Sequence, residues 1–277
     1  MNILIYIILA ALVGGGVEGK VENGISGRLQ SSFGKKAQVK VEVDRGHRSP
    51  LSRSINSINI ELADFKVQGE SAQGMAFRLD KKTMGGRIDR ISIKARRFEI
   101  EGLAIKEMQV NIEQLKYNFW KAVAKHQLEV LRVDKCGGEI VFEEKALNKF
   151  IAPRVKELEE FHLKLSHGEV IITGKAKTRL HISVPVELTC KLVPHMGMIF
   201  LTEPRLKATV VPLPSFVAQR VVDQVNPVIN LNRDSQLPCQ LKITQLKVEP
   251  ALLTARADLL FRAPAKPKPR PKTAAQR

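Results

Sequence analysis

The sequence predicts an α+β fold in which a strongly curved antiparallel β-sheet wraps amphipathic helices. Two segments within residues 55–112 match each other without a gap at an offset of 33 residues, and their apolar residues recur mostly at every second position. That period is typical of strands with one buried face. Apolar residues at spacings of three and four predict amphipathic helices at about 143–160 and 214–228. Because Pro153 cannot lie within a helix without removing a hydrogen bond, the first region is expected to be one helix to about Ile151 and a second that starts at Pro153. A strand pair with one apolar face cannot bury that face alone, so we expect the repeated units to stack on a neighbour.

The repeat consists of nine matched pairs, six of which are identical. The pairs are Ile55/Ile88, Ile58/Ile91, Ile60/Ile93, Phe65/Phe98, Val67/Ile100, Gly69/Gly102, Met75/Met108, Phe77/Val110 and Leu79/Ile112. When the two ends of the chain are set aside, about 240 residues remain, which is enough for one large β-rich domain with a core or a lipid-sized cavity. We place this domain at residues 17–261.

Residues 1–16 are expected to form a signal peptide or a membrane anchor. Every residue from Ile3 to Val17 is apolar or glycine, but this run is shorter than the roughly 20 residues that a membrane-spanning helix needs. No Lys or Arg precedes it, so an apolar helix of the folded domain is the alternative. From residue 17 to Phe33, apolar residues recur at every fourth position and predict an amphipathic helix. That helix either caps the open face of the sheet or lies flat on a membrane.

The chain is strongly basic, with a net charge of +17. Residues 262–277 hold six basic residues and no acids, and their alternating prolines predict a disordered basic tail. The remaining charge of +11 belongs to the body of the chain. Such a charge favours an anionic partner such as lipid head groups, nucleic acid or an acidic protein. A basic surface that only keeps the protein soluble is the alternative.

A strip of basic side chains is predicted on one strand of the second repeat. Arg90, Lys94 and Arg96 alternate with its apolar residues, and Arg87 precedes them. On a strand these cations share the solvent side, where each Lys or Arg adds roughly 1 kcal/mol of attraction to an anionic membrane. We therefore predict that the strip binds head groups or another anionic surface, with an ordinary solvated sheet face as the alternative.

No catalytic, cofactor or metal motif is found. The sequence lacks GxSxG, HExxH, GxxxxGK[ST] and a GxGxxG after a strand, and its six histidines are scattered. Cys136, Cys190 and Cys239 form no CxxC pair, so we expect mostly buried structural cysteines and no zinc site. Aromatic residues make up only 5% of the chain, which leaves few platforms for base stacking. The sequence therefore predicts no enzyme, no cofactor and no metal, and makes nucleic acid an unlikely partner.

Four segments resemble a known family when they are taken in order. They read GRIDRISIKARRFEIEGLAIKEMQVNIEQL, EEKALNKFI, NPVINL and LPCQLKITQLKVEPALLTARADL. This arrangement resembles the LmeA-type phospholipid-binding family of cyanobacteria and actinobacteria over roughly residues 17–261. The resemblance implies a fold like the tubular lipid-binding proteins, with an apolar groove for acyl chains and an N-terminal export signal or anchor. It implies no catalytic residues.

The resulting hypothesis is a non-enzymatic phospholipid-binding or lipid-carrier protein of the cell envelope or internal membranes. We expect it to be exported or membrane-associated, in the periplasm, the envelope or a thylakoid, or else peripheral on the cytoplasmic membrane. The two helices would line the acyl groove with apolar side chains, namely Phe150, Ile151, Val155, Leu158, Val217, Val221 and Val225. One alternative is a structural or interaction protein with a packed core that docks on acidic partners through its tail. A nucleic-acid-binding protein is the third reading.

Overall fold

The computed structural model describes residues 36–44, 46, 54–67, 76–77, 85–100, 102–119, 129–156, 158–177, 183–208, 215–231 and 239–261. The expected signal peptide or anchor at 1–16, the amphipathic helix that follows it and the basic tail at 262–277 lie outside these residues. The side chain of Val217 also lies outside the description.

Most described residues belong to strands. The strands are β1 (Gln38–Asp44), β2 (Ser54–Ala63), β3 (Lys66–Val67), β4 (Ala76–Phe77), β5 (Gly85–Ile100), β6 (Leu103–Asn118), β7 (Glu129–Arg132), β8 (Lys135–Glu143), β9 (Leu158–Ser166), β10 (Glu169–Lys177), β11 (Ser183–His195), β12 (Met198–Ala208), β13 (Ile229–Asn230), β14 (Cys239–Glu249) and β15 (Leu252–Phe261). The helices are α4 (Glu144–Ile151), the 3-10 turn η1 (Ala152–Arg154) and α5 (Ser215–Val225).

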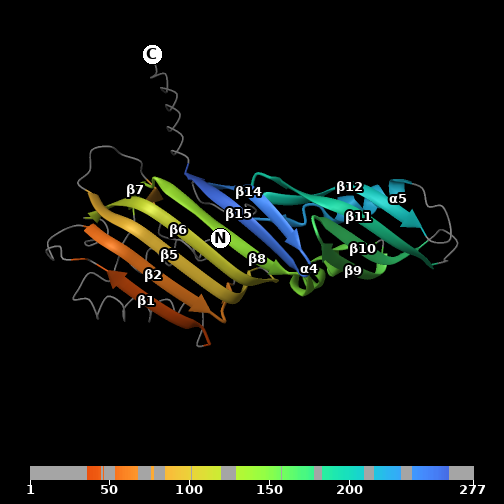
Figure 1. The fold of residues 1–277 in the computed structure, drawn as a ribbon, viewed down its shortest axis with the longest axis horizontal. Helices are drawn as coiled ribbons and strands as arrows, with labels where there is room; N and C mark the ends of the chain where they lie inside the picture. The colour runs from red at the N-terminus through yellow and green to blue at the C-terminus, as the bar shows by residue number, and fades with distance from the viewer. Residues whose placement is uncertain are drawn as a thin grey trace, which may run out of the picture.

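The strands form two sheets that follow one another along the long axis of the molecule (Figure 1). The main path of the larger sheet is β1-β2-β5-β6-β8-β15-β14, and the smaller sheet has the order β13-β12-β11-β10-β9. Helix α4 lies where the two sheets meet, and α5 lies against the smaller sheet (Figure 1). The β-rich, curled architecture agrees with the sequence, but within the described ranges the helices are two short elements rather than long ones that a sheet wraps.

The 33-residue repeat is a parallel ladder within the larger sheet. Strands β2 and β5 pair in parallel, and each residue of β2 stands beside the residue 33 positions later, as in Ile55 with Ile88 and Ile60 with Ile93. Strand β3 continues the same register. The prediction of an antiparallel sheet is therefore wrong at this pair, and also at β4 and β7, which are parallel. The two copies lie side by side in one sheet because equal spacing of their apolar residues keeps both sets on one face.

A backbone irregularity recurs at the same place in both copies. Asp64 and Arg97 are 33 residues apart, and both have positive φ, 58° and 49°. They bind each other through two hydrogen bonds of 2.8 Å that the guanidinium donates, and these bonds lower the pKa of the Asp64 carboxyl. Phe65 and Phe98 follow and stack with ring centroids 4.9 Å apart. Beyond this irregularity Phe65 and Phe98 lie on the buried face, at 3% and 2% exposure, and the pairing keeps its register.

The last third of the repeat does not keep this equivalence. Phe77 lies in β4 and pairs with Val130 of β7. Its counterpart Val110 lies in β6, which is antiparallel to β5. The matched apolar residues in this part of the repeat therefore do not have equivalent partner strands.

One face of the larger sheet is fully buried. Ile58, Ile60, Ile91, Ile93 and Ile112 are at most 1% exposed, and the residues between them face solvent or are partly covered. The alternation in the sequence thus predicted the two faces of these strands correctly.

The predicted end of the first helix at about Ile151 is confirmed, but the prediction of a second helix from Pro153 is wrong. α4 ends at Ile151, the 3-10 turn η1 carries Pro153 near its start, and β9 begins at Leu158. Leu158 is therefore a strand residue and not part of a helix that reaches residue 160. Proline removes a backbone donor that a continuing α-helix would need. The second helix, α5, ends at Val225, two residues before Pro227.

Candidate functional site

Two asparagine side chains attach the helical segments to the edges of the smaller sheet. Strand β9 is one edge of that sheet, and β12 is covered by the two-residue strand β13 only at its start. Unpaired backbone groups at a sheet edge need partners when they are shielded from water. Asn148 supplies these partners at β9, and Asn226 supplies them at β12.

Asn148 lies inside α4 and binds β9 in the way that a neighbouring strand would. Its Oδ1 accepts a hydrogen bond of 2.6 Å from the Leu163 amide, and its Nδ2 donates one of 2.6 Å to the Leu163 carbonyl. One turn earlier, Glu144 Oε2 accepts a bond of 2.7 Å from the Leu165 amide. One face of α4 therefore closes the edge of β9, and Leu163 and Leu165 themselves are 1% exposed.

Asn226 continues the hydrogen bonding between β13 and β12 by one residue pair. Its Oδ1 accepts a hydrogen bond of 2.7 Å from the Leu201 amide, and its Nδ2 donates one of 2.9 Å to the Leu201 carbonyl. The Val228 amide then donates to the Ile199 carbonyl at 2.9 Å. The end of α5 is thereby fixed against β12. Neither asparagine was predicted from the sequence, although an amide side chain within the apolar pattern of 143–160 was a usable signal.

The two helical segments meet where most of the predicted acyl-groove residues lie. The Lys156 amide donates a hydrogen bond of 3.0 Å to Gln224 Oε1 of α5. This bond joins the chain after η1 to the last turn of α5. The predicted residues on both sides are buried, with exposed fractions of 0% for Ile151, 5% for Val155 and 1% for Val225.

The other predicted groove residues differ in their surroundings. Val221 and Leu158 are buried at 2% and 6% exposure. Phe150 is only partly buried, and the guanidinium of Arg154 lies over its ring, 3.9 Å from the centroid. That contact is a cation–π interaction at the border between the interior and solvent. Among the predicted groove residues whose side chains the structure describes, Phe150 is the one at the surface.

The predicted basic strip lies on the outer face of β5, among acids that the sequence alone could not place there. Arg96 forms an ion pair with Glu107 of β6 (3.6 Å). The register places Glu61 of β2 beside Lys94 and Glu113 of β6 beside Arg90. The strip is therefore part of a mixed-charge sheet face, which reduces its attraction for anions.

Arg87 also has an acidic neighbour. It forms an ion pair with Asp89 at 2.6 Å between Nε and Oδ1, although the alignment of these two atoms is not that of a hydrogen bond. A longer hydrogen bond of 3.4 Å joins its second guanidinium nitrogen to Oδ2. All four cations of the strip thus have an acid as an ion-pair partner or as a neighbour in register.

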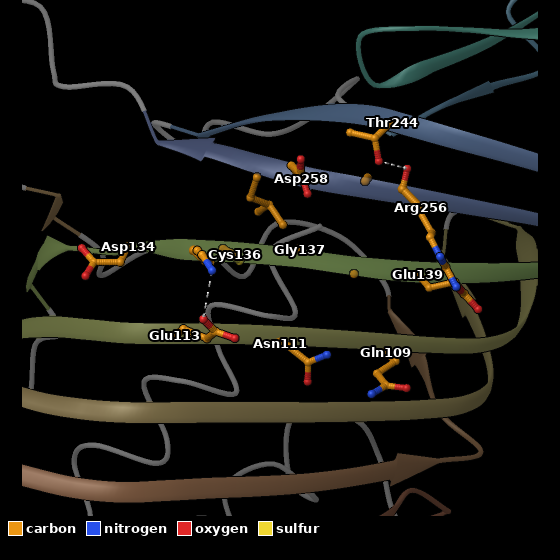
Figure 2. A pocket seen from close by; sticks show the side chains of 14 residues that line it. Gln109, Asn111, Glu113, Asp134, Cys136, Gly137, Glu139, Thr244, Arg256 and Asp258 are labelled. Carbon is orange, nitrogen blue, oxygen red and sulfur yellow. Dashed lines mark hydrogen bonds and ion pairs between the residues drawn. The ribbon is translucent and has the colours of Figure 1, made fainter.

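A depression of about 810 Å³ lies on the outer face of the larger sheet, on the side opposite the buried isoleucines. Strands β6, β8, β15 and β14 line it (Figure 2). Its floor is Gly137, which has no side chain, and Asn111 and Asp258 stand beside this glycine on the neighbouring strands.

The charges of the depression do not suit a phosphate. Its two cations already have acidic partners, since Arg256 binds Glu139 at 2.6 Å and Lys135 lies 3.9 Å from Glu113. Asp134 and Asp258 add further negative charge to the lining. An anionic head group would be repelled there, so we do not assign the head-group site to this depression.

Redox or nucleophilic chemistry finds no support in the described cysteines. Cys136 and Cys190 are buried and belong to no disulfide, and burial raises the pKa of the Cys190 thiol to about 12. Cys190 is therefore a neutral thiol at physiological pH and a poor nucleophile. In the described ranges no three His, Cys, Asp or Glu side chains gather as a metal site would require. None of the described helices has the length and apolar character to cross a bilayer.

Comparison with known proteins gives one match. A family model described as LmeA-like phospholipid-binding matches residues 73–258, which is about two thirds of the chain. No curated protein and no solved structure matches the chain. The matched range contains α4, α5 and both asparagines, whereas β1, β2 and β3 precede it.

Proposed function

Because the chain belongs to the LmeA-like phospholipid-binding family, we propose that it is a non-enzymatic phospholipid-binding protein that carries lipid acyl chains in its apolar interior. The family match is the observation that carries this proposal. It works at a membrane of the cell envelope or at an internal membrane.

The energetics suit a carrier. Burying one CH₂ group is worth about 0.8 kcal/mol, so a 16-carbon chain gains roughly 13 kcal/mol relative to water. A lipid that leaves a bilayer loses about the same amount. A groove as apolar as the bilayer therefore exchanges lipid at little net cost, and no chemical energy source is needed.

The acyl chain lies where the segment that follows η1 contacts the last turn of α5. Ile151, Val155 and Leu158 contribute from one side, and Val217, Val221 and Val225 contribute from α5. The bond from Lys156 to Gln224 supports this assignment because it holds the two sides together. Phe150 stands at the surface beside Arg154 and forms the mouth of the groove.

The head group stays near the protein surface, where guanidinium and ammonium groups are its natural partners. Arg87, Arg90, Lys94 and Arg96 remain the candidates on the larger sheet. Their acidic neighbours limit the attraction, so this part of the proposal needs its own test. Exchange of all four for glutamine lowers the affinity for anionic phospholipid if they bind the head group, and leaves it unchanged otherwise.

Native mass spectrometry of protein purified without detergent tests acyl binding. We expect phospholipid to accompany the wild-type protein and to be lost from Val225→Trp, because the indole occupies the groove. Gln219→Trp is the matched control, since Gln219 is an exposed residue of the same helix. A wild-type protein that carries no phospholipid and takes none up from liposomes contradicts the proposal. Strong destabilisation by Val225→Trp would instead indicate a packed core.

A further inference from the structure

The described residues expose large apolar side chains at one place, the turn between β11 and β12. Within the described ranges only Val193 and Met196 are exposed large hydrophobic residues, at 41% and 45%. They are three positions apart. Scattered single apolar residues are normal on a protein surface, whereas a group of them at a turn needs an explanation.

The outer face of this hairpin changes from polar to apolar as it approaches the turn. Thr189 and Lys191 are on the outer face of β11, and Val193 follows them at the next outward position. Val193 pairs across the hairpin with Phe200, which is partly exposed. The ring of His195 meets Phe200 edge-on at 6.4 Å. The apolar group therefore spans both strands and the turn.

Neighbouring backbone holds this turn in place. The Ile243 amide of β14 donates a hydrogen bond of 2.8 Å to the Met196 carbonyl, and the Leu231 amide donates one of 2.9 Å to the Gly197 carbonyl. Met196 itself has a positive φ of 53°. The apolar side chains are thus presented on a fixed loop, so little conformational entropy is lost when they bind a partner.

The basic tail begins close to the same turn. Ile243, which bonds to Met196, pairs with Ala257 of β15, and the described structure ends four residues later at Phe261, opposite Cys239. Four residues along a strand correspond to roughly 13 Å. The next sixteen residues, 262–277, contain six Lys or Arg and no acid, and sixteen residues span at most about 55 Å. The last described residue before this concentrated positive charge therefore lies roughly 13 Å along β15 from the partner of Ile243, which bonds to the apolar turn.

From this juxtaposition we propose that the β11–β12 turn inserts Val193 and Met196 into the surface of an anionic bilayer while the tail binds its head groups. One weak signal alone gives marginal and reversible membrane binding, whereas an apolar insertion combined with a polybasic segment gives stable attachment. This inference rests on the proposed phospholipid-binding function, because it states where the protein meets the membrane that supplies the lipid.

Vesicle co-sedimentation tests the proposal with the full chain. The probes are vesicles of phosphatidylcholine alone and vesicles of phosphatidylcholine mixed with phosphatidylglycerol. The double variant Val193→Ser/Met196→Ser binds mixed vesicles at least about tenfold more weakly than wild type, because two apolar side chains no longer enter the acyl boundary. Exchange of the six tail cations for glutamine removes the preference for mixed vesicles. His162→Ser/His167→Ser, at exposed positions of the β9–β10 hairpin, is the matched control and leaves binding unchanged.

Tryptophan fluorescence supplies a second readout that does not depend on affinity. In a Trp120→Phe background, Met196→Trp shifts its emission to the blue when mixed vesicles are added, and His167→Trp shows no shift. Wild-type binding by the serine variant, or an unshifted Met196→Trp spectrum on bound protein, overturns the proposal. A third outcome also overturns the proposal. If the wild-type protein is a dimer, and Val193→Ser/Met196→Ser makes it a monomer without weakening vesicle binding, the turn is a contact between two copies.

Uptake of a dissolved short-chain phospholipid, measured without vesicles, tests the groove separately. Failure of this uptake contradicts the proposed function and leaves the vesicle result standing. Normal uptake by the serine variant, together with lost vesicle binding, supports both proposals.

Discussion

At the scale of single residues, two amide side chains connect the helical segments to the smaller sheet. Asn148 and Asn226 each satisfy one backbone amide and one carbonyl of a strand. They belong to EEKALNKFI and NPVINL, two of the segments on which the family resemblance rests. Their role explains why these short segments matter in a protein with no catalytic motif, since they fix the positions of the apolar residues around them.

Replacement of either asparagine by alanine is expected to lower the free energy of unfolding by about 2 kcal/mol, because it leaves a shielded amide and carbonyl of Leu163 or Leu201 without partners. Urea denaturation of Asn148→Ala and Asn226→Ala measures the change. Gln219→Ala, at an exposed position of α5, is the control and should change the free energy by less than about 0.5 kcal/mol. Equal stability of all three variants would show that water replaces the amides at no cost.

At the scale of elements, the larger sheet depends on a close approach between β6 and β8. A Cβ on Gly138 would lie 2.5 Å from the backbone oxygen of Gln109. A Cβ on the adjacent Gly137 would meet only the end of the Asp258 side chain at 3.1 Å and the Ala257 carbonyl at 3.3 Å. A side chain at Gly138 would therefore clash with the backbone of β6, whereas a methyl group at Gly137 would make only tight contacts.

We expect Gly138→Ala to destabilise the protein by about 1–3 kcal/mol, because the methyl group forces two paired strands apart. Gly137→Ala should change the stability by less than about 1 kcal/mol in either direction, since lower entropy of the unfolded chain offsets the close contact. Thermal or urea unfolding of the pair measures the difference. If the two variants have the same stability, β6 and β8 do not approach each other closely enough at Gly138 to exclude a methyl group.

At the scale of the whole molecule, the net charge of +17 is distributed unevenly. On the outer face of β5, cations alternate with the acids of neighbouring strands, whereas the tail at 262–277 carries only positive charge. In the proposed function, long-range attraction to an anionic membrane therefore depends more on the tail than on the sheet. Lipid retention is assigned by the same proposal to the apolar interior, which does not depend on charge.

Salt should weaken association with anionic vesicles without releasing the bound phospholipid. Raising the ionic strength from 0.1 M to 1 M shortens the Debye length from about 10 Å to about 3 Å. We expect association with anionic vesicles to fall by at least about tenfold over that range, because the attraction of the tail is screened. The amount of phospholipid that remains bound per protein after re-isolation should not change. Parallel loss of both would mean that charge, not the apolar interior, holds the lipid.

The sequence by itself determined which face of each strand is apolar, where two helices begin, and the offset of the repeat. These features depend on local periodicity, because the side chain of a residue points to a side fixed by its own backbone. The same periodicity could not decide that β2 and β5 run parallel, since alternation is identical in both directions. It also placed Leu158 in a helix, because an apolar spacing of three or four persists for a few residues beyond a proline that ends the helix.

Only the tertiary structure decided what stands beside each functional candidate. It placed Glu61, Glu107 and Glu113 next to the basic strip, and joined the segment after η1 to the last turn of α5. It also bonded the apolar turn to β14, the partner of the last described strand. Each of these relations joins residues that are far apart in the chain, and the choice among many possible partners is made by the packing of the whole core. The sequence therefore predicted the kind of surface that each element carries, whereas the fold determined which surfaces meet.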